Sequence, residues 1–280
     1  MPPFDLQGHR GARGLRPENT LPSFEAGFDA GVSSVETDLH LTADGIVVLC
    51  HEPTIEGDRV SGLSLAELRR HRLDRNPDPA RFPGQSADVP ELARAFAAER
   101  GFDAYAGECG RRAGKSDRQR ERAGRVRFDL ELKRVPFFPE TINDGFDGSA
   151  PGPLERQVVA AARAAGVVGR TLVRSFDHRC VRLLRQLGPR LTGAVLISET
   201  APVDPVALVR AADCAIYCPS YEFLDRDVIQ QSQAAGLRVV PWTVNDPEHM
   251  KRLLDWGING ITTDYPDRLA PLLDARGIVY

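Results

Sequence analysis

The sequence predicts an α/β protein, a single (β/α)8 TIM barrel, and three observations lead to this fold class. Short apolar runs rich in β-branched residues alternate with helix-like segments, which implies a parallel sheet covered by helices. Eight such runs fit within 280 residues, an ordinary length for one barrel. No glycine-rich phosphate loop follows the first run, which disfavours the alternative of an open doubly wound sheet.

The candidate elements follow one another in regular order along the chain. The eight expected strands cover residues 4–10, 34–39, 126–133, 170–176, 191–197, 214–220, 237–244 and 260–264. Between them lie helix-like stretches such as "NTLPSFEAGFDAG", "PLERQVVAAARAAG", "RCVRLLRQLG" and "DVIQQSQAAG", each ending in the glycine that often caps a helix. We therefore expect one domain over residues 1–280, with a small insertion at approximately 52–124 before the third strand.

One strand-like run, "GIVVLCH", follows the second strand with no helix between them. An Asp-Gly pair flanked by alternating apolar residues is a strong signal for a β-hairpin. We expect a two-residue turn at Asp44 and Gly45. This turn places Asp38 opposite His51 on the return strand, and a register one step different places Glu36 there instead. Either register brings an imidazole beside two acids.

Ionisable residues collect at the C-terminal ends of the expected strands, where barrel enzymes have their active sites. Glu36 and Asp38 are two residues apart in the second strand, so both side chains face the same way. Glu131 and Lys133 have the same spacing in the third strand. The other candidates at this end are His9 and Arg10 after the first strand, His51 on the return strand and Trp242 in the seventh strand.

These residue types together suit the cleavage of a phosphodiester. The three carboxylates of Glu36, Asp38 and Glu131 suit a hard divalent cation such as Ca²⁺ or Mg²⁺. Arg10 and Lys133 are cations of the kind that hold a phosphate. The two histidines can supply a general base and a general acid at neutral pH. The sequence therefore predicts metal-assisted hydrolysis.

Five longer motifs, in this order, extend the comparison beyond single residues. They are "HRGARGLRPENTLPSFEAG", "VETDLHLTADGIVVLCHEPTI", "LELK", "SFD" and "PWTVNDPEHMKRLLDWGINGITTDYPD". In order and spacing they resemble the glycerophosphodiester phosphodiesterase family, from Gly8 to Asp267 except residues 101–125 and 136–152. The resemblance implies a (β/α)8 barrel that hydrolyses glycerophosphodiesters to an alcohol and sn-glycerol 3-phosphate, usually with a divalent cation.

The resemblance also implies a role for each candidate residue. These roles are an acid–base pair (His9 and His51), ligands of one divalent cation (Glu36, Asp38 and Glu131), and substrate or phosphate contacts (Arg10, Lys133 and Trp242). The cation is expected to be Ca²⁺ or Mg²⁺, and Trp242 is expected to form an apolar wall against the glycerol carbons. Glu52 departs from the family, which more often has Asp after the second histidine.

Two other functions are compatible with the same barrel. Phe137 and Phe138 follow the third strand in a proline-rich loop, where they form either a lip for a lipid-like headgroup or a cover for the barrel edge. A lysophospholipid or other lipid-headgroup phosphodiesterase is therefore one alternative, and a non-catalytic phosphate-binding module is another. The presence of both histidines and all three acids argues against the binding module, because binding alone requires charge but no matched acid and base.

Several other polar residues have open interpretations. Asn19 and Thr20 are expected to cap the first helix at least as readily as they would contact the site. His40, one step from Asp38, is expected to face away from the acids and lie at the surface. Asp264, which ends the eighth strand, either accepts a hydrogen bond inside the barrel or merely closes the barrel. The basic segment 103–124 is expected to be a solvated loop.

Bulk properties limit the partners and the location of the protein. The net charge of -3 gives no support to a nucleic-acid partner, and no apolar run reaches the ~20 residues of a membrane span. Five scattered cysteines suit reduced thiols, and the N-terminus lacks a secretory signal. We expect a cytoplasmic protein, unless a leader has been removed, whose partner is a small glycerophosphodiester. The sequence does not indicate an oligomeric state.

Overall fold

The structure, a computed structural model, describes residues 3–73, 87–88 and 125–280. Its parallel strands are β1 (Asp5–Gly8), β2 (Ser34–Leu41), β8 (Arg127–Leu132), β9 (Thr171–Ser175), β10 (Thr192–Ile197), β11 (Ile216–Pro219), β12 (Arg238–Val239) and β13 (Gly260–Thr263). Within the described residues they form one sheet in the order β12–β11–β10–β9–β8–β2–β1–β13. Each strand overlaps its predicted range.

Backbone hydrogen bonds join the two ends of this order and close the barrel. Thr262 N donates to Pro241 O at 3.0 Å, and Val244 N donates to Thr262 O at 3.0 Å, just past the end of β12. Nearer the start of the strands, Asn259 N donates to Val239 O at 3.2 Å. The predicted (β/α)8 fold is therefore confirmed.

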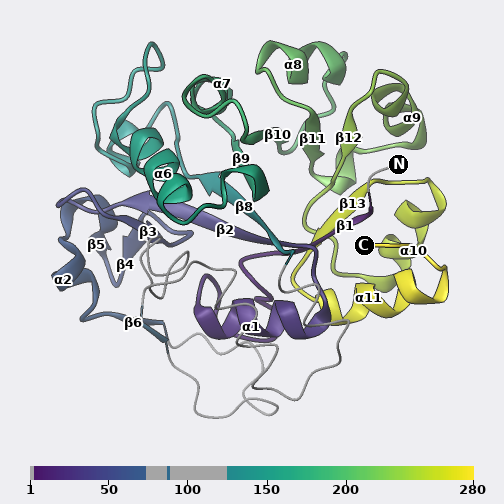
Figure 1. Cartoon of the computed structure of the whole chain (residues 1–280), viewed down its shortest axis with the longest axis horizontal. Helices are drawn as coiled ribbons and strands as arrows, with labels where there is room; N and C mark the ends of the chain where they lie inside the picture. Colours follow the sequence, from purple (N-terminus) through teal and green to yellow (C-terminus); the bar gives the residue numbers. More distant parts are fainter. Residues whose placement is uncertain (1–2, 74–86, 89–124) are drawn as a thin grey trace.

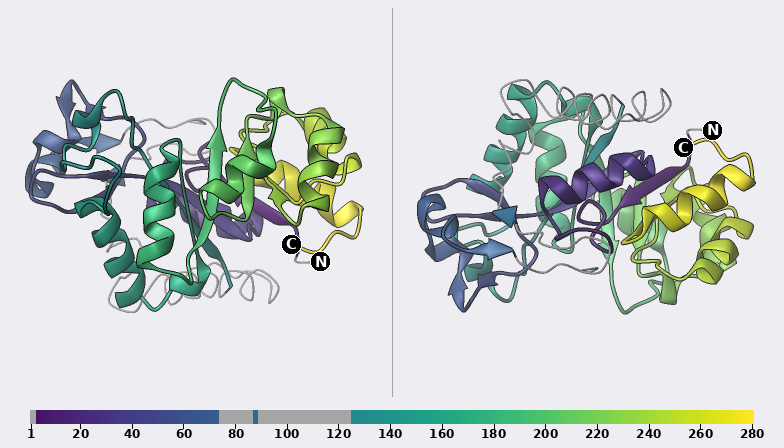
Figure 2. Two further views of the ribbon diagram at one scale, coloured as in Figure 1. Left: turned by 90° about the horizontal axis from the view of Figure 1, so that it is seen from above. Right: turned by 90° about the horizontal axis from the view of Figure 1, so that it is seen from below.

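Helices cover the outside of the barrel, and the two chain ends lie side by side (Figures 1 and 2). The helices are α1 (Leu21–Ala30), α2 (Leu65–Leu68), α6 (Pro153–Ala164), α7 (His178–Leu187), α8 (Pro205–Ala211), α9 (Arg226–Ala234), α10 (Pro247–Asp255) and α11 (Pro266–Ala275). Thr20 caps α1 as predicted, because its hydroxyl accepts a hydrogen bond from Ser23 N. Across the part of the chain that the structure describes, every helix is too short or too polar to cross a membrane.

Several short strands and 3-10 turns lie outside the barrel strands and the covering helices. They are the strands β3 (Val47–Leu49), β4 (Thr54–Ile55), β5 (Asp58–Arg59), β6 (Arg72–Leu73) and β7 (Ala87–Asp88), and the 3-10 turns η1 (Val60–Gly62), η2 (Pro139–Thr141), η3 (Val168–Arg170) and η4 (Tyr221–Phe223). Residues 74–86 and 89–124, including the basic segment 103–124, lie outside the described residues. The single domain and its insertion at 52–124 therefore stay predictions.

The inside of the barrel differs between its two halves. Around β9 to β12 it is filled by a small apolar cluster: Leu172, Ala194, Leu196, Ile216, Cys218 and Val240. Around β1, β2 and β8 the buried side chains are polar or charged: Gln7, Glu36, Asp38, Asp129 and Glu131. The larger apolar core lies outside, where residues such as Leu39 and Leu130 pack with those of the helices. One half of the barrel thus supports the other, which carries the charges.

The β2–β3 hairpin has a different register from the predicted one. Cys50 N donates to Asp38 O at 3.1 Å, so neither Asp38 nor Glu36 lies opposite His51. The predicted two-residue turn is wrong because the loop has three residues and ends at Gly45. The φ of Gly45 is +78°, the left-handed conformation that such loops place at their last residue.

His40 is fully buried, so the prediction of a surface position is wrong. Its Nε2 lies 3.3 Å from His51 O, and its Nδ1 lies 3.4 Å from Thr141 O in η2. The chain around η2 covers a face of β2 that strand alternation alone assigns to solvent. Burial lowers the pKa of His40 to about 4, so the neutral ring supports the backbone of His51 at pH 7.

A tight turn after β1 directs the next residue toward the barrel. His9 N donates to Thr263 O at 2.9 Å, and Gly11 N donates to Glu36 O at 3.1 Å. The φ of Arg10 is +49° and that of Gly11 is +89°. A Cβ on Gly8 would lie 1.9 Å from Gly11 O, so the turn requires glycine at this position.

We expect Gly8→Ala to lower the free energy of unfolding by about 1–3 kcal/mol, because the turn must shift to admit the methyl group. Denaturant unfolding would measure the change. Gly169→Ala is the matched control, since a Cβ there meets nothing within 4 Å. Equal stability of the Gly8 variant and the wild type would contradict this account of the turn.

We expect His40→Gln to weaken the pH dependence of stability between about pH 4 and 6.5. The pKa of His40 is lowered to about 4 in the folded state, so below 6.5 the unfolded chain binds the proton first. Stability should therefore fall as the pH falls through this window, by up to about 3 kcal/mol in the wild type. Unfolding curves at several pH values would test this, and parallel profiles for the two proteins would exclude the effect.

Candidate active site

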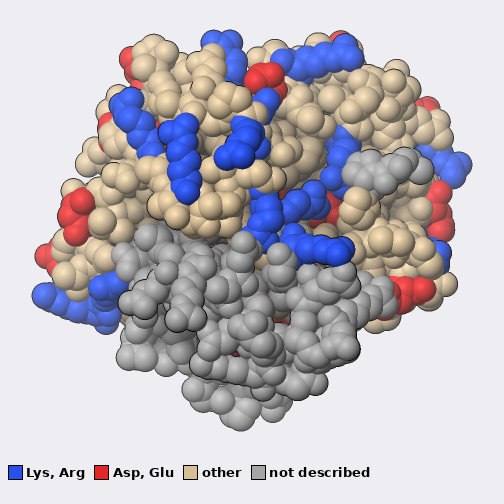
Figure 3. All heavy atoms as spheres, viewed as in Figure 1, with Lys and Arg blue, Asp and Glu red and all other residues tan. Residues whose placement is uncertain are grey.

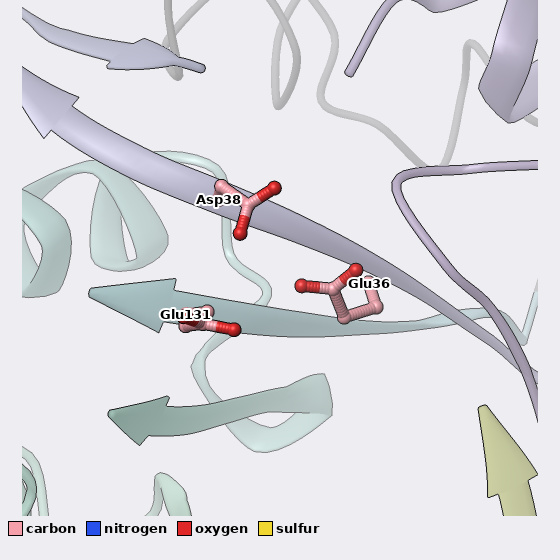
Figure 4. Close-up of side chains that lie close together, drawn as sticks. All are labelled: Glu36, Asp38 and Glu131. Atoms are coloured by element: carbon pink, nitrogen blue, oxygen red, sulfur yellow. The ribbon is translucent and has the colours of Figure 1, made fainter. Parts of the chain in front are cut away.

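Three carboxylates meet inside the barrel near the C-terminal ends of two neighbouring strands. Glu36 and Asp38 come from β2 and Glu131 from β8 (Figure 4). One ligand oxygen from each lies within 4.8 Å of the others, and all three residues are buried. The strand register explains their meeting, because Asp38 is the direct partner of Glu131.

Glu36 has a hydrogen bond on only one of its two oxygens. Its Oε2 accepts from Arg10 N at 2.8 Å and lies 3.9 Å from His9 Nε2. Its Oε1 is 3.3 Å from Arg174 Nη2 but has no hydrogen bond within the described residues. Burial, followed by the charge of Asp38, raises the pKa of Glu36 to about 8. This carboxylate therefore lacks sufficient positive charge around it.

Asp38 has the opposite surroundings. It accepts a hydrogen bond from Asn19 Nδ2 at 2.9 Å, and it pairs with Arg10 Nε at 3.1 Å and Lys133 Nζ at 3.4 Å. Burial alone would raise the pKa of Asp38, but the charges of Lys133 and Arg10 hold it well below its usual range. Lys133 Nζ also lies 2.6 Å from Glu131 Oε1. Both predicted phosphate contacts are thus held against the acids.

The side chain of His9 points into this site, and a carboxylate fixes the ring through Nδ1. Its Nδ1 lies 2.6 Å from Asp264 Oδ1, which answers the open question about Asp264: its carboxylate points inward. Asn245 Nδ2 in turn donates to Asp264 Oδ2 at 2.8 Å. Burial lowers the pKa of His9, and the charge of Arg10 adds to this effect, although Asp264 opposes it. The ring is therefore oriented with Nε2 toward Glu36.

His51 follows shortly after the end of β3 at Leu49. Its Nδ1 is 2.7 Å from Glu52 Oε1, so the residue at which the family pattern departs still pairs with the imidazole. His51 lines the same cavity as Lys133, whose ammonium group pairs with Asp38 and Glu131. Each histidine thus has a carboxylate on Nδ1.

A cavity of about 340 Å³ opens beside His51 and Lys133. Val135 and Phe138 line its wall. The side chains of Phe137 and Phe138 are 83% and 52% exposed, and their rings meet edge to face at 4.9 Å. The cavity therefore has an exposed apolar surface at its edge.

The loop that carries these aromatic rings is anchored by a buried arginine. Arg134 binds Glu155 at 2.6 and 2.9 Å and Asp144 at 2.9 and 2.6 Å, with two nitrogens on each carboxylate. Such bidentate arginine–carboxylate pairs fix the orientation of the side chains as well as neutralising their charges. The loop therefore leaves β8 and returns to α6 at defined points.

Trp242 lies on the apolar side of the barrel mouth. Its Nε1 donates to Cys218 O at 3.0 Å, and its ring meets Phe176 edge to face at 5.6 Å. The ring is half-buried against the inner apolar cluster. Its predicted role as the wall for glycerol remains a prediction.

The three acids fit a hard divalent cation. All the donors are carboxylate oxygens, which Ca²⁺ and Mg²⁺ prefer. Glu36 Oε1 has no hydrogen bond within the described ranges, and the raised pKa of Glu36 shows a shortage of positive charge. A cation among the acids would satisfy both. The identity of the ion stays open.

One residue important for this arrangement was not predicted. Arg174, only 2% exposed, lies between Glu36 and Asp129, 3.1 Å from the latter. The signal was an arginine inside an otherwise apolar strand, at the position that pairs with Glu131. Asn19, for which a helix cap and a contact with the site were both left open, binds Asp38, and its φ is +56°.

Comparison with known proteins gives one consistent result. The family model for the glycerophosphoryl diester phosphodiesterase family matches residues 9–108 and 150–268. A glycerophosphodiester phosphodiesterase from Bacillus subtilis is 25% identical, covering 92% of this chain and 83% of its own. A crystal structure from Silicibacter pomeroyi that carries the family's name has a TM-score of 0.78 at 26% identity, covering 100% of this chain and 96% of its own.

A phosphodiesterase from Oleispira antarctica, solved with the product sn-glycerol-3-phosphate, has a TM-score of 0.74 at 22% identity. The match covers 97% of each chain and shows the fold. These findings confirm the family predicted from the sequence: the chain belongs to the glycerophosphoryl diester phosphodiesterase family.

Proposed function

We propose that this enzyme hydrolyses glycerophosphodiesters to an alcohol and sn-glycerol 3-phosphate, with one divalent cation and two catalytic histidines. The observation that carries the proposal is the buried cluster of Glu36, Asp38 and Glu131, with His9 Nε2 3.9 Å from Glu36 and with His51 and Lys133 lining the adjacent cavity. The Oleispira neighbour, with its bound sn-glycerol-3-phosphate, supports the product.

Glu36, Asp38 and Glu131 would hold the cation. When bound, it supplies positive charge to the phosphate oxygens as a Lewis acid. Arg10 and Lys133, which now pair with the acids, are close enough to contribute to binding the same phosphate.

His9 is the proposed general base. Asp264 accepts a hydrogen bond from Nδ1–H of His9. Nε2 is therefore free of a proton and can accept one from the hydroxyl group that attacks the phosphorus. The lowered pKa of His9 keeps the ring neutral and able to do so. His51 is then the general acid that protonates the leaving alkoxide, and Glu52 holds the ring through its Nδ1.

The cavity beside His51 favours a second candidate on the same barrel. Its apolar wall and the exposed Phe137 and Phe138 suit an alcohol with an apolar part, as in a lysophospholipid. Relative turnover of glycerophosphocholine and lysophosphatidylcholine would separate the two candidates. The cytoplasmic location and the absence of a nucleic-acid partner stay predictions.

We expect EDTA to abolish the release of glycerol 3-phosphate from glycerophosphocholine, and Ca²⁺ or Mg²⁺ to restore it. Calorimetric titration of the metal-free protein should show one bound ion. Glu36→Gln should weaken this binding at least about tenfold, because one charged ligand is removed. The ion that restores activity would also identify the natural cofactor.

Glu140→Gln serves as the control, since Glu140 is a half-exposed carboxylate at the edge of the cavity beside His51. It should leave ion binding unchanged. Unaltered ion binding by the Glu36 variant, or full activity in EDTA, would refute the metal assignment.

We expect His9→Ala and His51→Ala each to lower kcat by about 10²–10⁴-fold, the usual contribution of a general acid or base. Calorimetry should show that both variants still bind the cation. A glycerophosphodiester with a nitrophenyl leaving group should rescue His51→Ala but not His9→Ala, because nitrophenolate leaves without a proton.

Rescue of the His9 variant instead would reverse the two roles. Near-wild-type turnover of glycerophosphocholine by both variants would exclude the two-histidine mechanism.

A further inference from the structure

A second cavity lies at the opposite end of the barrel from the three acids. Its volume is about 650 Å³, within the range of small-molecule sites. Six of its lining residues are the first residues of consecutive barrel strands β2, β8, β9, β10, β11 and β12: Ser34, Arg127, Thr171, Thr192, Ile216 and Arg238. Parallel strands begin at one rim, so this cavity is the N-terminal mouth of the barrel, here called the lower mouth.

The lower mouth is strongly basic. Arg127, Arg170 and Arg238 line it, from β8, η3 and β12 respectively. Among the described residues that line it, none is acidic. Figure 3 shows Lys and Arg side chains gathered around a hollow in the middle of the molecule.

The arginines are held in place by the barrel. Arg127 Nη2 lies 2.7 Å from the buried carboxylate of Asp5. Arg170 Nη1 donates to Val126 O at 2.7 Å. These contacts order two of the guanidinium groups before any ligand arrives, which lowers the entropic cost of binding.

Arg238 is ordered in the same way but keeps donor capacity. Its Nη2 donates to the backbone oxygens of Pro3 and Asn259 at 3.0 and 3.1 Å. Its Nε is buried and has no hydrogen-bond partner within the described ranges. Burial removes the guanidinium groups of Arg238 and Arg170 from water and so lowers the pKa of both. The charged groups therefore lose favourable hydration. An anion in the cavity would compensate for this loss.

The chemistry of the lining indicates the kind of anion. A guanidinium presents a planar fork that matches phosphate, and three of them exceed what one carboxylate ligand requires. Leu172, Ile216 and Leu237 add an apolar part to the lining. Such a mixture suits a phosphate group attached to a small organic body.

We propose that the lower mouth binds a small organic phosphate or polyphosphate at a site separate from the hydrolytic one. The proposal rests on the geometry of the cavity and its three arginines, and it does not depend on the proposed reaction.

Calorimetric titration with inorganic pyrophosphate, in EDTA to exclude metal complexes, tests the site. Binding should be detected at about 1 mM and should weaken as salt is added. Lys133→Gln removes a predicted phosphate contact at the other end of the barrel, so it should leave this binding in place. Binding lost through Lys133→Gln alone would assign the anion to the hydrolytic site and overturn the proposal.

Three substitutions locate the binding in the lower mouth. Arg238→Gln and Arg170→Gln should each lower the affinity at least about tenfold, since each removes a charge-assisted hydrogen bond. Thr192→Asp places a carboxylate at an exposed position of the lining and should do the same without removing any arginine contact. Arg226→Gln, on the outer helix α9, is the matched control and should bind as the wild type does.

The three lower-mouth variants and Arg226→Gln should keep wild-type turnover of glycerophosphocholine, which checks that they are folded. If pyrophosphate does not bind the wild type, or binds Thr192→Asp and Arg238→Gln with wild-type affinity, the lower mouth is not an anion site.

Discussion

The repulsion between buried carboxylates is the constraint around which the rest of this structure is arranged. Glu36, Asp38 and Glu131 lie together where water cannot screen their charges. Arg174 approaches Glu36 from inside the barrel, while Lys133 pairs with the other two acids from the mouth. Even so, the raised pKa of Glu36 shows that the compensation is incomplete. The cluster is therefore compatible with a divalent cation, which would add positive charge among the acids.

This arrangement explains why the barrel is filled so unevenly. A charged half could not hold its own shape, because like charges separate whenever the backbone yields. The apolar cluster around β9 to β12 fills the other half. The two strands that carry the acids, β2 and β8, pair directly with each other along six residues. Trp242 lies between the two halves, with its polar nitrogen bound to a backbone oxygen.

The sequence was sufficient for the barrel fold and for the meeting of Glu36, Asp38 and Glu131, because both follow from local patterns. Strand and helix periods alternate, and acids spaced two apart share a face. It was insufficient where the answer depends on a single loop residue or on distant packing. Gly45 lengthens the hairpin turn by one residue, and no pattern distinguishes the two lengths. His40 is buried by η2, a hundred residues away in the chain, and Arg174 reaches Glu36 across the barrel.

The anchored loop after β8 has a consequence for how substrate choice can change. Arg134 ties both ends of the loop to the framework, and the exposed Phe137 and Phe138 lie between these ties. Mutations at the two phenylalanines disturb no hydrogen bond of the anchor and little of the core. This segment can therefore change in sequence while the acids, the histidines and the barrel stay as they are. Under the proposed function, Phe137 and Phe138 are side chains through which the preference for the alcohol group can change without loss of the fold.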